Sequence, residues 1–117
     1  MAINKKIYDI NEIKKIISTI FKTCGVEKAY IFGSYARGEA GEDSDIDIII
    51  KKGKIRTLFQ IAELEQLLMN ALGKQVDLIT EETYIGEDGL NEESAELKNI
   101  NDIFYNNIVK ERIKIYG

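Results

Sequence analysis

The chain has 117 residues, a net charge of −4 and a hydrophobic fraction of 44%, as expected for one soluble globular domain. Histidine is absent, which excludes Ser-His-Asp and Cys-His nucleophile pairs and zinc sites with imidazole ligands within the chain. The single cysteine, Cys24, excludes an internal disulfide, and the acidic balance disfavours a broad nucleic-acid footprint. We therefore expect one domain over residues 1–117, cytoplasmic, without a membrane span and without direct DNA binding.

The first predicted element is a helix over residues 9–24. Asp9 can cap it, Glu12 stands where the carboxylate of a capping box belongs, and Gly25 is a natural stop. Apolar residues recur at helical spacing on one face: Ile10, Ile13, Ile16, Ile17, Ile20 and Phe21. A short strand over residues 27–32 is predicted to follow.

After this strand, a Gly-Ser turn opens a short helical segment that Ser34 is expected to cap. The isoleucine-rich residues 45–50 predict a second strand. A second helix is predicted over residues 55–72, with Gly73 as its stop. Its apolar positions are Leu58, Ile61, Ala62, Leu64, Leu68 and Ala71.

The remaining residues predict a third strand over 75–80, an acidic loop over 81–96 and a last helix over 93–112. Helices and strands thus alternate along the chain. This order predicts an α/β or α+β domain in which helices cover a small sheet.

Two carboxylates stand two residues apart at the second predicted strand. Side chains alternate along a strand, so Asp45 and Asp47 point to one face, while Ile46 and its alternating neighbours point to the core. Two convergent carboxylates repel one another unless a cation neutralises them. An all-oxygen site of this kind suits Mg²⁺, completed by water and phosphate oxygens, and Mn²⁺ is possible.

A third carboxylate interrupts the next predicted strand. Val76 and Leu78 take the core face there, which leaves Asp77 on the opposite face. If this strand pairs beside residues 45–50, the three aspartates share one open face. Three such carboxylates can hold two divalent ions about 3.5–4 Å apart, the spacing that serves in-line phosphoryl displacement.

The Gly-Ser turn supplies groups that suit phosphate. Gly33 lets the backbone approach a ligand closely, Ser34 adds a hydroxyl donor, and the N–H groups of a helix start attract anions. Arg37 lies one turn later and can offer a forked cation to phosphate oxygens.

Each of these features has a simpler reading when it stands alone. A Gly-Ser pair is usually a turn, an Asp-x-Asp pair is often a solvated strand edge, and Asp77 could serve only to discourage edge aggregation. Arg37 alone reads as a surface ion pair. Their joint order and their shared faces are much more specific than any single member.

The segment from Gly33-Ser34-Tyr35-Ala36-Arg37-Gly38 to Ser44-Asp45-Ile46-Asp47 resembles the signature of the minimal nucleotidyltransferase (MNT) family, within the polymerase-β-like superfamily. The resemblance implies a small mixed β-sheet flanked by helices. It also implies transfer of a nucleoside monophosphate to an acceptor hydroxyl, with release of pyrophosphate. The main expectation is that the transferred group is AMP from ATP.

The resemblance also implies a role for each matched residue. Asp45 and Asp47 bind the metal ions, Asp77 is a further ligand and the general base, and Gly33 and Ser34 hold the triphosphate. Arg37 assists them. Whether Tyr35 touches the nucleotide base or only packs is left open.

Many chains of this family are antitoxins paired with a separately encoded HEPN ribonuclease toxin, which they silence by adding AMP to a tyrosine. The expected assembly is a hetero-oligomer with such a toxin. Two alternatives stay open at this point. The chain could neutralise a partner by contact alone, or it could bind nucleotide without turnover.

Overall fold

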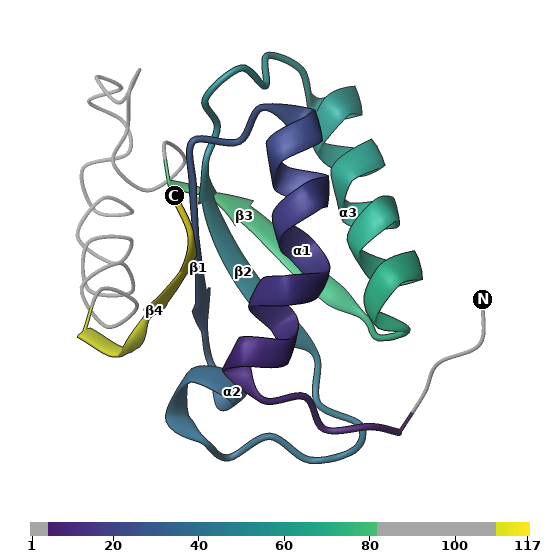
Figure 1. Ribbon diagram of the computed structural model, residues 1–117, viewed down its shortest axis with the longest axis vertical. Helices are drawn as coiled ribbons and strands as arrows, with labels where there is room; N and C mark the ends of the chain where they lie inside the picture. Colours follow the sequence, from purple (N-terminus) through teal and green to yellow (C-terminus); the bar gives the residue numbers. More distant parts are fainter. Residues whose placement is uncertain (1–4, 82–109) are drawn as a thin grey trace, which may run out of the picture.

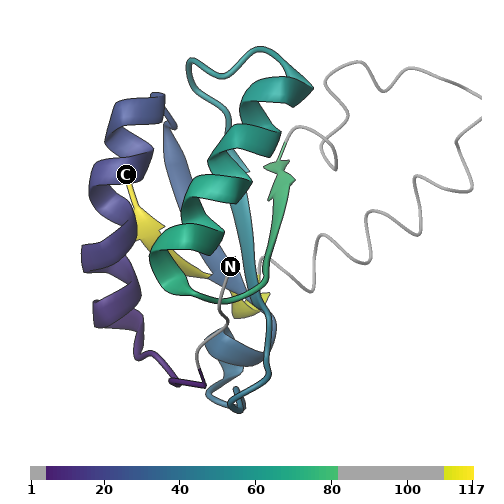
Figure 2. The same cartoon turned by 90° about the vertical axis from the view of Figure 1, so that its right-hand side faces the viewer.

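The computed structural model describes residues 5–81 and 110–117. Its elements in chain order are α1 (Ile10–Cys24), β1 (Lys28–Phe32), α2 (Ser34–Arg37), β2 (Ile46–Lys51), α3 (Leu58–Leu72), β3 (Val76–Thr80) and β4 (Ile113–Tyr116). The strands form one sheet in the order β3-β2-β1-β4, in which β2 and β3 are parallel and β1 is antiparallel to β2 and β4. The helices α1 and α3 lie side by side on one face of this sheet (Figures 1 and 2). The predicted mixed α/β fold is confirmed.

The core lies between this helix pair and the sheet. Strand β2 contributes Ile46, Ile48 and Ile50, none of which has any exposed surface. The helices bury Ile13, Ile17 and Phe21 from α1 and Leu64, Leu68 and Leu72 from α3. Each such side chain stabilises the fold by roughly 1.5–3 kcal/mol on burial, so one strand face holds much of the domain together.

Both long helices begin at a capping box. Asp9 accepts from the Glu12 backbone N–H and Glu12 bonds back to the Asp9 N–H, as predicted. The second helix begins at Leu58 and not at the predicted residue 55, because Thr57 and Gln60 form the same reciprocal cap. Leu58 consequently lies at the first turn with 84% of its surface exposed, outside the core face to which its spacing assigned it.

The prediction for the end of the chain is incomplete. A helix was predicted over residues 93–112, and most of that range, like most of the predicted loop 81–96, lies outside the described residues. Beyond Arg112 the chain forms β4, which no sequence pattern had predicted. The strand pairs with β1, and the Tyr116 ring lies 5.5 Å from the Phe21 ring between their centroids. The sheet therefore gains an edge strand from the far end of the chain.

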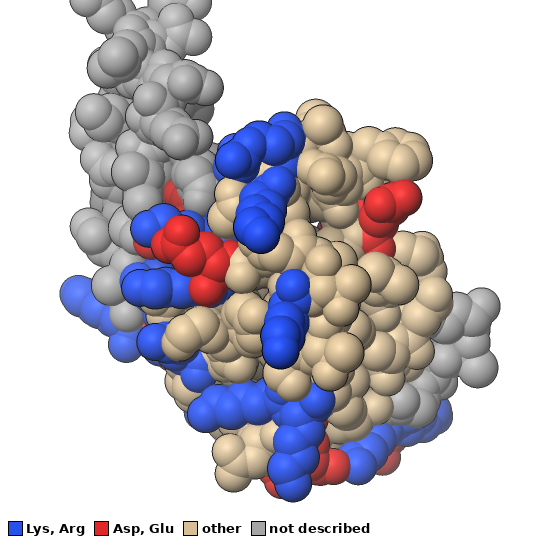
Figure 3. All heavy atoms as spheres, turned by 45° about the horizontal axis from the view of Figure 1, so that its top comes forward, with Lys and Arg blue, Asp and Glu red and all other residues tan. Residues whose placement is uncertain are grey.

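Basic side chains gather at one end of the molecule. Figure 3 shows Lys and Arg side chains gathered at the end where α1 ends and where residues 51–57 join β2 to α3. The short helix α2 lies at the opposite end of the molecule (Figure 1). No helix in the described part of the chain combines the length and the apolar character that crossing a bilayer requires.

Candidate active site

The turn between β1 and α2 is built on a conformation that only glycine adopts easily. Gly33 has φ 72° and ψ −149°, and a Cβ at this position would overlap the Oδ2 atom of Asp47. Gly33 occupies the N-cap position and no side chain caps α2, so Ser34 is the first helical residue rather than the predicted cap. The absence of a side chain at residue 33 thus lets the loop lie directly against an aspartate.

Asp47 and Asp77 stand side by side on adjacent strands. They are register partners in the parallel pairing of β2 with β3, as the predicted strand pairing requires. Asp47 is half-buried and Asp77 is exposed, and both lie on the face away from the buried Ile46 and Val76. The alternation predicted from sequence is therefore present in both strands.

This environment raises the pKa of Asp47 from 3.8 to about 6. Burial is the largest cause, followed by repulsion from Asp77 and a hydrogen bond with it, and then by repulsion from Asp45. The positive charge of Arg37 acts in the opposite direction. Four of the six predicted site residues, the three aspartates and Arg37, are therefore close enough to influence one protonation equilibrium.

Asp45 lies just before β2 and is exposed. The loop that leads to it is held by Lys74, whose buried ammonium donates to the Glu42 carbonyl oxygen at 2.8 Å, and by a 2.8 Å bond from the Gly41 N–H to the Ser44 hydroxyl. A hollow of about 130 Å³ opens beside Asp45. It is lined by Glu42, Asp43, Ser44, Asp45, Lys74 and Gln75.

The donors at this site are all carboxylate oxygens, which are the ligands that Mg²⁺ and Mn²⁺ prefer. Burial first, and then the neighbouring carboxylates Asp77 and Asp45, raise the pKa of Asp47, and a divalent cation would relieve the repulsion among these carboxylates. Within the described residues, no three ligating side chains converge tightly enough to enclose an ion by themselves. The set fits a hard cation that keeps water and phosphate oxygens among its ligands, and it does not form an all-protein cage.

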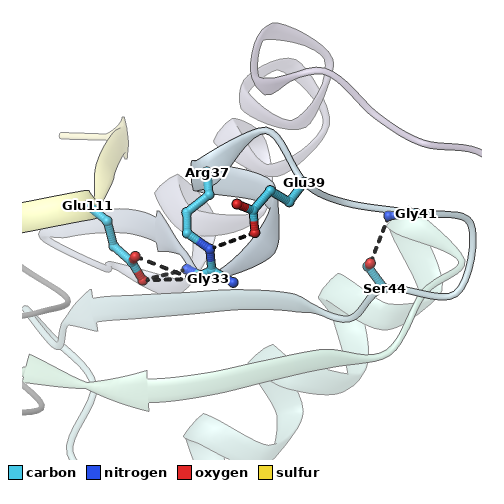
Figure 4. A network of polar contacts seen from close by, with 6 residues as sticks. All are labelled: Gly33, Arg37, Glu39, Gly41, Ser44 and Glu111. Atoms are coloured by element: carbon cyan, nitrogen blue, oxygen red, sulfur yellow. Dashed lines mark hydrogen bonds and ion pairs between the residues drawn. The ribbon is translucent and has the colours of Figure 1, made fainter.

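Arg37 is held by two carboxylates (Figure 4). Its Nε donates to Glu39 at 3.1 Å, and its Nη1 donates to both oxygens of Glu111 at 3.3 Å. These bonds raise the pKa of Arg37 further, that to Glu39 more than that to Glu111. Glu111 also accepts from the Gly33 N–H at 3.2 Å. Sequence reasoning missed Glu111 because it lies 78 residues from Gly33 and has no motif around it.

Tyr35 belongs to the core. It has 5% of its surface exposed and lies among the buried residues that α1 and the sheet enclose, and this burial raises the pKa of its phenol. The question that the sequence left open is answered by this placement: in this structure Tyr35 packs.

A family model described as a nucleotidyltransferase domain matches residues 10–115. A candidate protein adenylyltransferase of Methanocaldococcus jannaschii is 47% identical over 72 residues, which cover 62% of this chain and 77% of that protein. The protein adenylyltransferase MntA of Thermococcus cleftensis is 42% identical over 74 residues, covering 60% of this chain and 75% of the relative.

Among solved structures, the complex of a tri-AMPylated Shewanella oneidensis HEPN toxin with its MNT antitoxin contains a similar chain. It superposes with a TM-score of 0.59 at 19% identity, over 92% of this chain and 72% of that one. This likeness concerns the fold, and the sequence relatives carry the assignment. Because the family model spans nearly the whole sequence and the relatives align over three quarters or more of their own length, the chain belongs to the minimal nucleotidyltransferase family, a family of nucleotidyltransferase enzymes.

Proposed function

We propose that this chain transfers AMP from ATP to a hydroxyl group of a partner protein. The observation that carries the proposal is the in-register pair Asp47 and Asp77, set against the glycine loop at Gly33. A loop that can approach phosphates, and carboxylates that could hold a charge-neutralising cation, lie at one end of one sheet. The protein adenylyltransferase names of the sequence relatives support AMP as the transferred group.

In the proposed reaction, an acceptor oxygen attacks the α-phosphorus of ATP and its proton passes to the Asp77 carboxylate. The bond from the α-phosphorus to the bridging oxygen breaks, and pyrophosphate leaves. Asp77 is exposed, so an acceptor on another molecule can reach it. Positioning and charge neutralisation supply most of the rate in phosphoryl transfer, and they require no covalent intermediate.

Asp45, Asp47 and Asp77 would hold Mg²⁺, in two sites by the family pattern, with Mn²⁺ as a substitute. When bound, the metal would neutralise the charge that develops on the phosphate oxygens during transfer. Gly33 and Ser34 would hold the triphosphate. Gly33 would let the backbone lie close to it, since its own N–H is bonded to Glu111, and Ser34 would donate from its N–H and its hydroxyl. Arg37 would contribute its charge. Asp47 supports this assignment because it touches Gly33 and lies in register with Asp77.

For the acceptor, we propose a tyrosine of a HEPN toxin, with this chain acting as the cytoplasmic antitoxin in a hetero-oligomer. The support is the S. oneidensis complex, in which the HEPN toxin is AMPylated and the bound chain shares the fold described above.

Label transfer from α-³²P-ATP in the presence of Mg²⁺ tests this function, with the purified product of the neighbouring reading frame as acceptor. We expect wild type to label the acceptor and Asp47→Asn to reduce the rate by at least about a thousandfold, because charge stabilisation of the transition state is lost. Glu63→Gln is the matched control, since it removes an exposed carboxylate on α3, and it should keep the wild-type rate. Equal rates in all three proteins would overturn the assignment of Asp47.

Neutralisation by contact alone is the second candidate, and the same materials test it. It predicts that an Asp45→Asn/Asp47→Asn double variant still inhibits the partner as well as wild type does. A partner that is neutralised only when it carries label would exclude this candidate. Nucleotide binding without pyrophosphate release in the presence of the partner would instead indicate a binding module without turnover.

A further inference from the structure

Glu111 joins the far end of the chain to both parts of the candidate phosphate site. Its carboxylate accepts from the Gly33 N–H at 3.2 Å and from Arg37 Nη1 at 3.3 Å. Figure 4 shows Glu111 and Arg37 directed toward each other beside Gly33. Neither the family signature nor the aspartate set includes a residue from this part of the sequence.

The position of Glu111 is determined by the sheet. Ile113 of β4 is the register partner of Ile31 in β1, and these strands are antiparallel. Gly33 lies two residues after Ile31, just past the end of β1, and Glu111 lies two residues before Ile113, so continuing the antiparallel register brings the two together. The contact therefore depends on β4, the strand that completes the sheet beside β1.

The contact adds a side-chain restraint to a turn that is otherwise held by backbone bonds, such as that from the Arg37 N–H to the Gly33 carbonyl oxygen at 3.1 Å, and by the buried Tyr35. No side chain caps α2. Glycine can adopt many backbone conformations, so sterics alone do not hold Gly33 in the one observed here. An acceptor on the Gly33 N–H limits the rotation of that peptide. The same carboxylate holds one arm of the guanidinium, while Glu39 holds Nε. Among the described residues these bonds use Nε and Nη1, which leaves the Nη2 donors of Arg37 for another acceptor.

We propose that Glu111 is a positioning residue for nucleotide, which fixes the Gly33 loop and turns Arg37 so that its remaining donors face the phosphates. This inference rests on the proposed function. In this role Glu111 does not touch the reacting atoms. It acts through Gly33 and Arg37, and its own side chain is 29% exposed.

Glu39 provides the matched control within the same cluster. It bonds Arg37 as Glu111 does, carries the same charge and has a side chain that is 65% exposed, but it makes no contact with Gly33. Glu39→Gln and Glu111→Gln therefore remove the same charge from the same arginine. They differ in whether the loop loses its acceptor.

The experiment measures the dissociation constant of Mg²⁺-ATP by calorimetry and the Gly33 amide resonance by NMR, in wild type and both variants. We expect Glu111→Gln to raise the dissociation constant about tenfold, as for one lost charge-assisted hydrogen bond, and Glu39→Gln to raise it less than about twofold. The NMR resonance of the Gly33 amide should shift in Glu111→Gln and should keep its wild-type position in Glu39→Gln. The midpoint of thermal unfolding, measured on the same samples, should not separate the two variants.

The possible outcomes distinguish this inference from the proposed function. If wild type binds Mg²⁺-ATP and the two variants bind it equally, the role of Glu111 is overturned and the proposed function stands. Tighter binding by Glu111→Gln also overturns it, because the carboxylate would then be a competitor of phosphate. If wild type binds no nucleotide, the proposed function fails and this inference with it.

Discussion

The two faces of β2 place opposite chemistry on one six-residue strand. Ile46, Ile48 and Ile50 face the helices and have no exposed surface. Asp47 lies between the first two of them and faces the other way, toward Asp77 and Gly33. The first face is wholly apolar, whereas the second carries the fully buried Ile49 and the half-buried carboxylate of Asp47, which Asp77 repels when no cation is bound.

The difference shows how an electrostatically costly site is kept in place. The carboxylates lower stability in the free protein, as the raised pKa of Asp47 indicates, but the strand that carries them is anchored by its other face. Substitutions at neighbouring positions of this strand should therefore separate folding from activity.

The largest expected effect on stability belongs to the buried face. Ile48→Ala should lower the free energy of unfolding by about 3 kcal/mol, because it removes buried methyl groups and leaves a cavity. Asp47→Asn, one residue earlier, should leave the protein at least as stable as wild type. Urea unfolding of both variants checks this, and a similar loss in Asp47→Asn would mean that the two faces are not separable in this way.

The next effect concerns the contact between the loop and the aspartate. Gly33→Ala should lower the free energy of unfolding by about 2 kcal/mol, because φ stays positive in a region closed to alanine and the new Cβ displaces Asp47. Gly38→Ala is the control, since Gly38 has φ 73° and no atom within 4 Å of a Cβ, and it should cost only about 1 kcal/mol.

Thermal unfolding, together with nucleotide binding, measures both glycine variants. Only Gly33→Ala should also weaken Mg²⁺-ATP binding. If Gly38→Ala loses as much stability and as much nucleotide affinity as Gly33→Ala, the overlap with Asp47 is not the cause of the losses in Gly33→Ala.

The smallest effect is a pH dependence. The folded-state pKa of Asp47, about 6, lies above the value of 3.8 for an ordinary Asp. At pH values between these two, the folded state therefore binds more protons than the unfolded state. Stability should fall as pH rises through this window, and the loss should be complete above it. Asp47→Asn lacks this loss, so its free energy of unfolding should exceed that of wild type by about 1 kcal/mol at neutral pH and should equal it near pH 4. The figure of about 1 kcal/mol is reduced because Asp47 is partly exposed to solvent.

Urea midpoints of wild type and Asp47→Asn across that range measure the difference. Mg²⁺ should reduce the difference at neutral pH if the cation relieves the repulsion. A difference that does not change with pH would show that Asp47 titrates as it does in the unfolded chain.

The sequence predicted those parts of the fold that depend on local patterns. The capping box at Asp9 and the alternation around Asp47 and Asp77 involve residues within a few positions of each other, and both are present. Thr57 and Gln60 carry the same capping signal, but the predicted helix began at residue 55, before this cap.

Features that arise from distant pairing were not predictable in this way. The last strand, Ile113–Tyr116, has four residues, which is too short for alternation to distinguish it from the end of a helix. Its pairing with β1, and the bonds from Glu111 to Gly33 and Arg37, exist only once the sheet has formed. The residues of the signature were visible in the sequence, whereas the residue that restrains them was not.

The parallel register of Asp47 with Asp77 also fixes the size of the site. The distance between their Cα atoms is the spacing of neighbouring strands, about 4.8 Å, and main-chain hydrogen bonds maintain it. Because the main chain sets this separation, a replacement of a core side chain does not change it directly. The same rigidity means that the backbone cannot adjust to a longer acid, and a glutamate at either position would move its carboxylate by one methylene with no compensation from the strands.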